Sequence, residues 1–472
     1  MDPTLFLVTS TLVIVTLILF ITKKCSNLLS LPPGKYGWPI YGETHEYISR
    51  PEKFMRERMT KYSSKIFKTS VLGEKVAILC GPSGHKFLFS NDGKLFEFWM
   101  PPSLALALSV RDIDNNSWSS KLVQEQLHKF LKLESMQHLV AIMDSKAAHL
   151  FDTFWAPYEQ VKVQPLAKDF TFTLTCCLFI NYSSQEQVKE VAKPFFELHE
   201  DTMSKSVSLP FYSAKKRQEA VKNKIISIIK ERQIEVKNRE KEDDDGLFHD
   251  LLTRVLKASH ESGMIIDHKV IAGKINSLLF ASFYTISTAV TFIVYYLADH
   301  PHVYDKVLQE HLEIARSKKA GELLNWKDIQ KMKYSWNVAC ETMRLRPPAL
   351  GSFREVLADF TYAGFRVPKG WKVAWNAYSS HKDPEYFPNP EEFEPSRFEG
   401  NNNPIPPYAF VPFGGGPLMC GGKEYARIEI LVFLHSLVTR FKFWKVNPLE
   451  EIIYTPIATP VEGLPIRLEK IK

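Results

Sequence analysis

Apolar residues recur at helical spacing through most of this chain. The clearest stripe lies on a segment rich in lysine and arginine, and it consists of Val221, Ile225, Ile228 and Ile229. Apolar side chains three and four residues apart share one face of an α-helix, so the pattern predicts an amphipathic helix here. The charged run from Arg239 to Asp245 follows and is interpreted as a solvated loop.

Longer patterns predict two more helices. One spans Asp267 to Ala298, and the other spans Trp326 to Arg346, where two prolines end it. Short runs predict strands at Ile66–Leu72, Lys75–Leu79, Phe360–Tyr362 and Lys372–Ala374. The pattern therefore indicates a mostly α fold with small β-sheets. No Pro-, Gly- or Ser-rich linker interrupts residues 44–472, so we expect one large domain there.

The amino terminus has a different pattern. Thr4 to Thr22 carries no charge, and 19 helical residues rise about 28 Å, roughly the hydrocarbon thickness of a bilayer. Two lysines follow and only one aspartate precedes, which places the body of the chain on the cytosolic side. A cleaved secretory peptide is the alternative, but that requires a basic start and a shorter apolar run. We expect residues 1–3 to be lumenal, 4–22 to form a single transmembrane anchor and 23–43 to form a Pro/Gly hinge.

Composition and cysteine spacing exclude several classes. The 472 residues are 45% hydrophobic, with a net charge of +7 and no basic stripe interleaved with aromatics, which argues against nucleic acid as a partner. None of the six cysteines forms a C-x-x-C pair, so a structural zinc site is not indicated, and a disulfide framework is not expected. Cys80, Cys176, Cys177 and Cys340 are expected to be small buried hydrophobes.

Cys420 differs because five glycines surround it, with Phe413 seven residues upstream. Glycines let the backbone approach a bulky group, and N–H donors aimed at a sulfur lower the pKa of the thiol. A helix is predicted from Lys423, immediately after this loop. A thiolate in such a position is suited to one axial bond to a large flat metal cofactor, which indicates haem.

A second pattern joins two distant segments. Glu341 and Arg344 are three residues apart on a predicted helix, so they lie on one face and can pair. A surface ion pair worth about 0–1 kcal/mol is the simpler interpretation. However, Arg397 lies ahead of the Cys420 loop, and a fully hydrogen-bonded Glu-Arg-Arg trio would fix that loop.

In order and spacing, the loop from Phe413 to Gly422, Glu341–Arg344 and Pro395–Phe398 together resemble the cytochrome P450 monooxygenases. The resemblance covers nearly the whole chain. Several further runs resemble the plant branch that oxidises triterpenoids and sterols, in particular its β-amyrin oxidases. These runs are Leu324–Trp326, Tyr334–Glu341, Val367–Trp371 and Lys423–Arg427.

The resemblance implies a single P450 domain in which Cys420 is the proximal ligand of haem b iron. Phe413, Gly416 and Gly422 would belong to the haem-binding loop. Glu341, Arg344 and Arg397 would be the trio that fixes the fold.

The resemblance also implies that Arg354 pairs with a haem propionate and that Thr285 hydrogen-bonds oxygen and relays protons. A threonine within a helix more often packs or bonds its own backbone, so both interpretations of Thr285 stay open. The implied partners are O₂, an apolar terpenoid, the lipid bilayer and an NADPH-dependent flavoprotein reductase. The implied location is the endoplasmic reticulum membrane, with the catalytic domain in the cytosol.

Some positions depart from the family pattern. Ser282 and Tyr284 replace a glycine and an acid before Thr285, and Leu418 replaces a basic residue before Cys420. Lys121 is a candidate propionate partner, because Gln124 stands where an arginine is usual. These departures leave two alternatives open: a haem-thiolate protein that rearranges a peroxide or is weakly active, and a catalytically decayed haem-binding protein.

Overall fold

The computed structural model describes residues 31–110, 114–115, 117–204, 211–239, 250–400 and 404–471. The expected lumenal residues and transmembrane anchor lie outside this part, as do residues 240–245 of the charged run. The described chain forms two compact units. Unit 1 contains the chain up to Trp99 together with Gly351–Ser380 and Gly415–Leu418, and unit 2 contains the rest.

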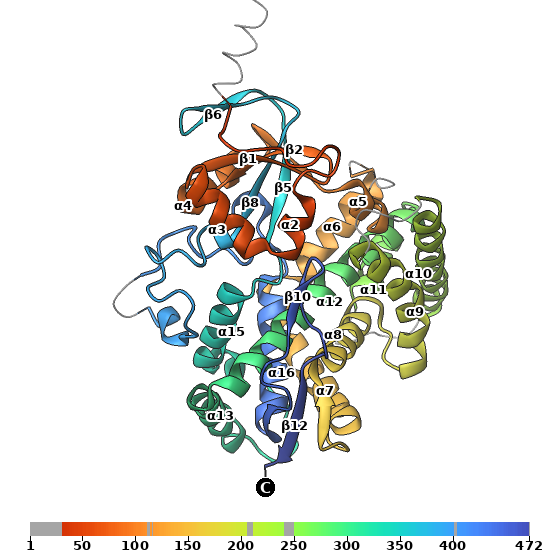
Figure 1. The fold of residues 1–472 in the computed structure, drawn as a ribbon. Helices are drawn as coiled ribbons and strands as arrows, with labels where there is room; N and C mark the ends of the chain where they lie inside the picture. Colours follow the sequence, from red (N-terminus) through yellow and green to blue (C-terminus); the bar gives the residue numbers. More distant parts are fainter. Residues whose placement is uncertain are drawn as a thin grey trace, which may run out of the picture. The chain divides into compact units, whose positions relative to one another are not determined.

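Unit 1 carries a five-stranded sheet with the strand order β1-β2-β8-β5-β3, and a separate β6–β7 hairpin (Figure 1). Its strands are β1 Ile66–Val71, β2 Glu74–Leu79, β3 Phe96–Trp99, β5 Gly351–Val356, β6 Phe360–Tyr362, β7 Phe365–Val367 and β8 Lys372–Asn376. Its helices are α2 Thr44–Ser49, α3 Pro51–Lys61 and α4 Gly81–Ser90, with short 3₁₀ turns η2 Ala377–Ser379 and η4 Gly416–Leu418. The four strands predicted from sequence are present: β6 has the predicted bounds, and the other three have one end shifted by one or two residues.

The described part of the expected hinge is attached to this sheet. The Lys68 N–H donates to the Pro33 carbonyl at 2.8 Å, and the Glu43 N–H donates to the Ser70 carbonyl at 2.7 Å, so both ends of the segment are bonded to β1. Between these two points the chain makes a turn on which Ile40 has a φ of 68°. Two large apolar side chains of this turn face solvent, since Trp38 is 81% and Ile40 is 89% exposed.

Unit 2 is mainly helical. Its helices are α5 Pro102–Ala107, α6 Trp118–Phe130, α7 Leu133–Phe154, α8 Val163–Ile180, α9 Gln185–Ser204, α10 Phe211–Arg239, α11 Leu251–Glu261, α12 His268–Asp299, α13 Pro301–Arg316, α14 Trp326–Lys331, α15 Lys333–Leu345 and α16 Lys423–Val438, with the 3₁₀ turn η3 Pro395–Phe398. Its strands are β4 Gln160–Lys162, β9 Phe441–Lys445, β10 Ile452–Tyr454, β11 Ala458–Pro460 and β12 Pro465–Lys470, arranged as β4-β12-β9 and β10-β11.

Helix α12 is the central element of unit 2 and packs against α8, α10, α15 and α16 (Figure 1). Its N-cap is Asp267, whose side chain accepts a hydrogen bond from the Lys269 N–H at 2.8 Å. Among the described helices, α12 is the candidate whose length and apolarity would suffice to cross a membrane, but 67% of its apolar window is buried inside the protein. That burial is what a core helix of a globular unit shows, and the helix predicted over Asp267 to Ala298 is confirmed.

The single helix predicted over Trp326 to Arg346 is wrong, because the chain breaks at Met332 into α14 and α15. The sequence contains neither proline nor glycine there. The cause is a distant side chain: the Glu310 carboxylate of α13 accepts hydrogen bonds from the N–H groups of Tyr334 at 2.8 Å and Ser335 at 3.0 Å. A carboxylate at these N–H groups stabilises a new helix N-terminus.

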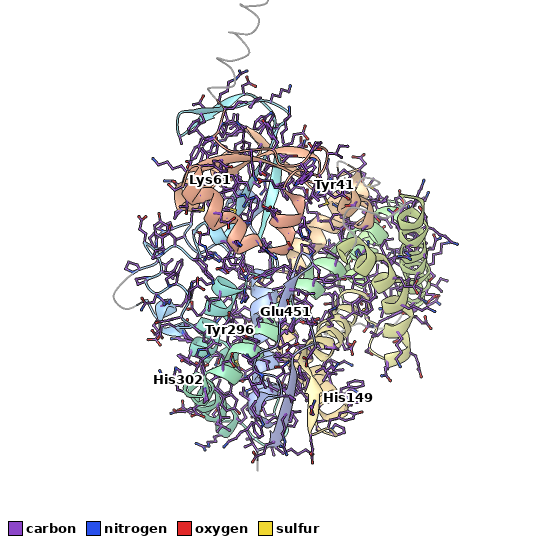
Figure 2. All side chains as sticks on the ribbon, in the orientation of Figure 1. Tyr41, Lys61, His149, Tyr296, His302 and Glu451 are labelled. Atoms are coloured by element: carbon purple, nitrogen blue, oxygen red, sulfur yellow. The ribbon has the colours of Figure 1, made fainter. Side chains whose placement is uncertain are left out.

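Aromatic and aliphatic side chains fill the interior between the helices of unit 2 (Figure 2). Tyr296, labelled on α12, stacks parallel to Phe393 with ring centroids 4.5 Å apart. The cysteines expected to be buried hydrophobes are buried, namely Cys80, Cys176, Cys177 and Cys340.

Candidate active site

Cys420 is the exposed cysteine among the five in the described residues, so its sulfur can bind an external group. Its backbone N–H donates to the Phe413 carbonyl at 2.9 Å, which closes the loop that precedes α16. The Phe413 ring lies nearly parallel to the Trp336 indole, with centroids 6.5 Å apart. Helix α16 begins at Lys423, as predicted, so the thiol lies three residues before a helix N-terminus.

The electrostatics of Cys420 differ from the prediction. We expected several N–H donors to lower the pKa of the thiol. In the structure the Gly422 N–H bonds the thiol and lowers its pKa, but desolvation by the surrounding chain outweighs this and leaves the pKa raised. A metal cation bound to the sulfur would reverse that balance, since a coordinated thiol loses its proton.

Close packing against α4 requires glycine at positions 415 and 416. Gly416 has a φ of +66°, and a Cβ there would lie 2.5 Å from the Phe89 carbonyl oxygen. A Cβ at Gly415 would lie 2.6 Å from the Phe89 ring. The bulky group that these two glycines accommodate is therefore Phe89 of α4. Gly422 is different, because its Cβ position is 3.8 Å from the Cys420 sulfur.

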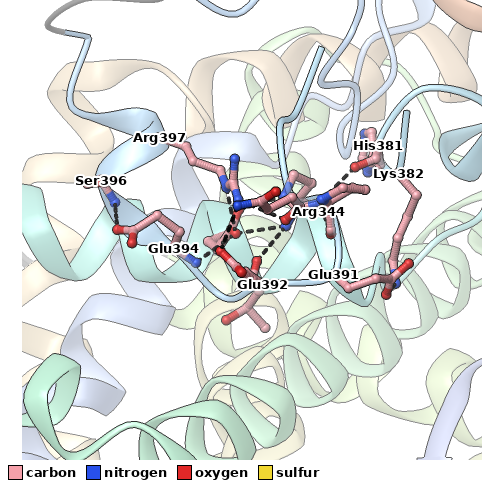
Figure 3. A network of polar contacts seen from close by, with 12 residues as sticks. Arg344, His381, Lys382, Glu391, Glu392, Glu394, Ser396 and Arg397 are labelled. Carbon is pink, nitrogen blue, oxygen red and sulfur yellow. Dashed lines mark hydrogen bonds and ion pairs between the residues drawn. The ribbon is translucent and has the colours of Figure 1, made fainter. Parts of the chain in front are cut away.

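Glu341 and Arg344 form a fully buried pair, with both side chains 0% exposed. Figure 3 shows the network of polar contacts in which Arg344 and Arg397 take part. Arg344 Nε and Nη2 donate to the two Glu341 oxygens at 2.7 and 2.8 Å. The other three N–H groups of Arg344 donate to the carbonyls of His381, Pro390 and Glu392 at 2.9, 2.8 and 3.0 Å. All five donors of the guanidinium thus have acceptors, as a buried cation requires.

Arg397 completes this network from η3. Its Nε lies 3.3 Å from Glu341 Oε1, and its Nη2 donates to the Asn389 carbonyl at 3.0 Å. The Glu394 N–H also donates to Glu341 Oε1 at 2.9 Å. One carboxylate therefore connects α15 with the 389–397 segment. The three residues that were grouped from the sequence are therefore in contact. The Glu341–Arg344 ion pair is buried, so the alternative of a surface ion pair is excluded.

Arg354 is 2% exposed on β5 and has protein acceptors of its own. Its Nε donates to Asp92 Oδ1 at 2.7 Å and its Nη2 to Asp92 Oδ2 at 3.4 Å, while Nη1 donates to Ser352 Oγ and the Phe353 carbonyl. Sequence reasoning missed Asp92, which lies 262 residues away in a turn-like Asn-Asp-Gly run. Among the described residues, one N–H of Arg354 is left for a further acceptor.

Thr285 lies on the least buried face of α12. This face, which we call the open stripe, carries residues that are exposed or half-buried at helical spacing: Lys274, Ser277, Leu278, Ala281 and Thr285. The Thr285 hydroxyl donates to the Ala281 carbonyl at 2.7 Å, so it bonds its own helix. A hydroxyl held in this way keeps its oxygen lone pairs available as acceptors.

The two unusual residues before Thr285 point elsewhere. The Ser282 hydroxyl donates to the Leu278 carbonyl at 2.9 Å and lies 3.1 Å from Thr175 Oγ1 of α8. Tyr284 is 8% exposed, and its ring packs against Phe283 at 4.6 Å between centroids. Neither side chain therefore crowds the open stripe, although the carboxyl group usual before the threonine is still missing.

The remaining candidates lie on exposed surfaces. Lys121 is an exposed residue of α6, and so is Gln124. Leu418, in the position of the missing basic residue, is 48% exposed. The Lys121 contact with a propionate stays a prediction.

The family profile for cytochrome P450 matches residues 32–463 of this chain. The chain belongs to the cytochrome P450 family. A retinoic-acid-bound cyanobacterial P450 has the same fold, with a TM-score of 0.79 and 26% identity over 93% of this chain and 99% of that one. Units 1 and 2 are thus parts of one P450 domain.

Plant P450s are much more similar in sequence. β-Amyrin 6-β-monooxygenase of Solanum lycopersicum is 46% identical over 100% of both chains. β-Amyrin 28-monooxygenase of Panax ginseng is 47% identical over 93% of this chain and 92% of its own, and that of Medicago truncatula is 47% identical over 95% and 94%. The recognised family is confirmed, and the protein is a P450 monooxygenase with a haem whose iron is bound by a cysteine thiolate.

The residues of unit 2 fit this cofactor. Cys420 is exposed and would supply a soft sulfur ligand, to which the Gly422 N–H donates one hydrogen bond. A cysteine thiolate is one of the side-chain ligands that hold haem iron in proteins. The fit is poorer at Arg354, because Asp92 already occupies the fork of its guanidinium. Cys420 would therefore hold the haem iron through its sulfur, whereas Arg354 is less available to a propionate.

Proposed function

We propose that this P450 hydroxylates a triterpenoid scaffold of the β-amyrin type, with O₂ and with electrons from an NADPH-dependent flavoprotein reductase. The observation that carries the proposal is the match over the full length of both chains to a β-amyrin 6-β-monooxygenase at 46% identity. The relatives named above act at two different positions of β-amyrin, so the oxidised carbon is left open.

Cys420 is proposed as the residue that would hold the haem iron through its sulfur. Haem held by a thiolate supplies oxygen activation, because the sulfur donates electron density that favours O–O cleavage. The loop closed by the Phe413 carbonyl would orient the sulfur, and the Gly422 N–H donates a hydrogen bond that favours the thiolate form of Cys420. Glu341 and Arg344 hold the segment that precedes this loop.

Thr285 is proposed as the residue that binds and orients oxygen. Its hydroxyl lies on the open stripe and donates to the Ala281 carbonyl, so its oxygen can accept a hydrogen bond from a water molecule, and turning the hydroxyl away from Ala281 would let it donate to oxygen. Tyr284 is buried among aromatic rings, so we propose that water reaching the stripe supplies protons to Thr285. Substrate would lie along the same stripe, where Ala281 presents a small apolar surface.

We further propose that residues 4–22 anchor the protein in the endoplasmic reticulum membrane, with the catalytic domain in the cytosol. The charge-free run and its flanking lysines support this. The exposed turn of Trp38 and Ile40, attached to β1, supports it too, because tryptophan favours the membrane interface.

The test is co-expression of the full chain with a reductase in yeast that makes β-amyrin. The expected result is a product heavier by one oxygen atom, formed only with NADPH and reductase. Cys420→Ser should abolish both the product and the red-shifted band of the reduced, CO-bound haem. A wild-type chain that shows this band but oxidises none of several triterpene scaffolds would overturn the substrate assignment alone.

One observation favours a second candidate, a haem-thiolate protein that rearranges a peroxide. The position of the usual acid is held by Tyr284, whose ring is buried in an aromatic cluster, which weakens proton delivery for O₂ activation. Turnover of an added lipid hydroperoxide without NADPH would establish this activity, whereas NADPH-dependent oxygen insertion would rule it out.

A further inference from the structure

A fully buried carboxyl group lies in the core of unit 2, and the site described above does not use it. Glu429 is 0% exposed on α16, and neither of its oxygens has a partner in direct hydrogen-bond geometry among the described residues. Burial raises the pKa of this carboxyl group well above its ordinary value, and no cation of the described chain offsets that effect. An isolated buried carboxylate is costly, so the resting group is the neutral acid and carries a transferable proton.

Tyr425 lies beside Glu429 on the same helix. It precedes Glu429 by four residues, so the two side chains share one face of α16. Its hydroxyl is also buried without a direct partner among the described residues, yet each of the two groups shifts the pKa of the other. Bound water commonly completes the hydrogen bonds of such buried groups, so we expect one water molecule to connect them.

Thr175 of α8 extends this row of polar groups toward α12, which packs against both α8 and α16 (Figure 1). Burial raises the pKa of Tyr425, and the Thr175 hydroxyl partly offsets this effect, so the two hydroxyls lie near each other. Thr175 Oγ1 also lies 3.1 Å from Ser282 Oγ of α12, and either hydroxyl can donate in that contact. Side chains from three helices thus form a row that we call the buried relay: Glu429, Tyr425, Thr175 and Ser282.

Ser282 is the residue at which the buried relay reaches the proposed active site. It is half-buried, and Thr285 follows three residues later on the same side of α12, about 4.5 Å along the helix axis. The family pattern has glycine at position 282, and glycine has no hydroxyl to contact Thr175. The departure from the family pattern at Ser282 is therefore what connects the buried row to the open stripe.

We propose that Glu429 is an internal proton donor for the reaction, and that the buried relay delivers its proton to water beside Thr285. The O–H bond of the acid breaks, each hydroxyl of the relay gains one proton and passes its own proton on, and no electron moves. Glu429 is left as a carboxylate, which regains a proton from water at the open stripe by the reverse transfer. The inference rests on the proposed function and assigns a source of protons to it.

The physical reason is the position of the acid in an apolar core. A neutral acid holds a proton near the site without the cost of a buried charge, and the carboxylate left after transfer is unfavourable enough to be reprotonated between turnovers. The Thr175 and Ser282 hydroxyls also donate to carbonyls of their own helices, so each must rotate to pass a proton on. The relay residues act through water at Thr285, and they are therefore positioning residues.

The experiment uses the full chain with its haem, reconstituted with reductase in lipid nanodiscs. Glu429→Gln removes the acid with little change in shape, Thr175→Val and Ser282→Ala each remove one hydroxyl, and Thr175→Ser retains it. Thr291→Val is the matched control. Thr175 and Thr291 are both 0% exposed, and each hydroxyl donates to the carbonyl four residues earlier at 2.7 Å, so the two substitutions differ in the contact with Ser282.

The first measurement requires no turnover. The infrared difference spectrum between wild type and Glu429→Gln should contain the carbonyl band of one protonated carboxylic acid, and this band should shift in D₂O. After mixing with D₂O, the shift should develop about ten-fold more slowly in Thr175→Val and Ser282→Ala, the effect expected from the loss of one hydrogen bond. Thr291→Val should behave as the wild type does, and Thr175→Ser should restore the rate.

The second measurement is turnover of β-amyrin. Thr175→Val, Ser282→Ala and Glu429→Gln should each lower kcat about five-fold with KM unchanged, and should raise the solvent isotope effect on kcat. Complete loss of acid catalysis costs about 10²-fold or more, and the smaller fall is expected because water at the open stripe still supplies protons. Thr291→Val should leave kcat and the isotope effect unchanged.

The proposal is overturned if the difference spectrum of Glu429→Gln contains no carboxylic acid band, because Glu429 would then be ionised at rest. It is also overturned if Thr175→Val matches Thr291→Val in proton exchange and isotope effect. A fall in kcat that is accompanied by equal falls in haem content and unfolding midpoint would indicate a structural role and would overturn it too. A chain that oxidises no triterpenoid would refute the proposed function, whereas the infrared band and its exchange rate would still decide whether the relay exists.

Discussion

The strongest stability prediction concerns Arg344, whose five N–H groups all have acceptors in unit 2. Arg344→Ala leaves Glu341 buried with only the Arg397 ion pair and the Glu394 N–H. Removing one partner of a buried ion pair costs about 3–5 kcal/mol. The free energy of unfolding of a domain is typically about 5–15 kcal/mol, so this single substitution would remove a large part of it.

Two companion variants make the magnitude testable. Arg397→Ala should cost only about 1–2 kcal/mol, because Glu341 keeps both bonds from Arg344 and Arg397 is partly exposed. Arg344→Lys keeps the charge but offers three donors in place of five, so at least two acceptors lose their partner and we expect about 2–3 kcal/mol.

The assay is urea titration of the purified holoprotein, followed through both haem absorption and tryptophan fluorescence. Unfolding midpoints should fall in the order wild type, Arg397→Ala, Arg344→Lys and Arg344→Ala. The reasoning is refuted if Arg397→Ala lowers the midpoint as much as Arg344→Ala does, or if Arg344→Lys matches the wild type.

Three further predictions concern other parts of the molecule. Gly416→Ala should lower the free energy of unfolding by about 1–3 kcal/mol and also lower the haem content, because φ is +66° and a carbonyl oxygen lies 2.5 Å from the new Cβ. The haem content is measured by the pyridine-haemochrome assay. Gly421→Ala is the control in that assay, because the nearest atom to its new Cβ is 3.8 Å away. Because burial lowers the pKa of His199 from 6.5 to about 4, the unfolded chain binds more protons below pH 6.5 and stability falls as the pH drops toward 4. His199→Phe should therefore flatten the loss between pH 7 and 5 by about 2 kcal/mol in urea titrations. Asp92→Ala should destabilise the protein by about 3–5 kcal/mol, since it leaves the Arg354 guanidinium buried without its anion, and thermal unfolding that matched the wild type would exclude a structural role for the pair.

Local signals made much of the fold and part of the site predictable. The helix at α12 follows from its own apolar pattern, and the Cys420 loop is a continuous run whose helix begins at the expected residue. The grouping of Glu341, Arg344 and Arg397 required only order along the chain. In each case the determining interactions involve residues close in sequence or a motif with fixed spacing.

Long-range interactions account for what sequence reasoning missed. The break at Met332 depends on the Glu310 carboxylate of another helix. Arg354 is engaged by Asp92 across 262 residues, and nothing near either residue signals the pair. Asn276 resembles any polar residue of a helix until the fold brings the Ala107 carbonyl to it, 169 residues away in sequence.

The position of Arg344 also has a consequence for the order in which the chain folds. Its carbonyl partners come 37, 46 and 48 residues later in the sequence, so α15 can form well before the segment that it binds. Loops of this length must close before those contacts contribute, which places them late on the folding path. Interactions formed after the transition state chiefly slow unfolding. The guanidinium of Arg344 therefore acts as a latch that lengthens the lifetime of the folded segment leading to the cysteine loop, with little influence on how fast that segment first folds.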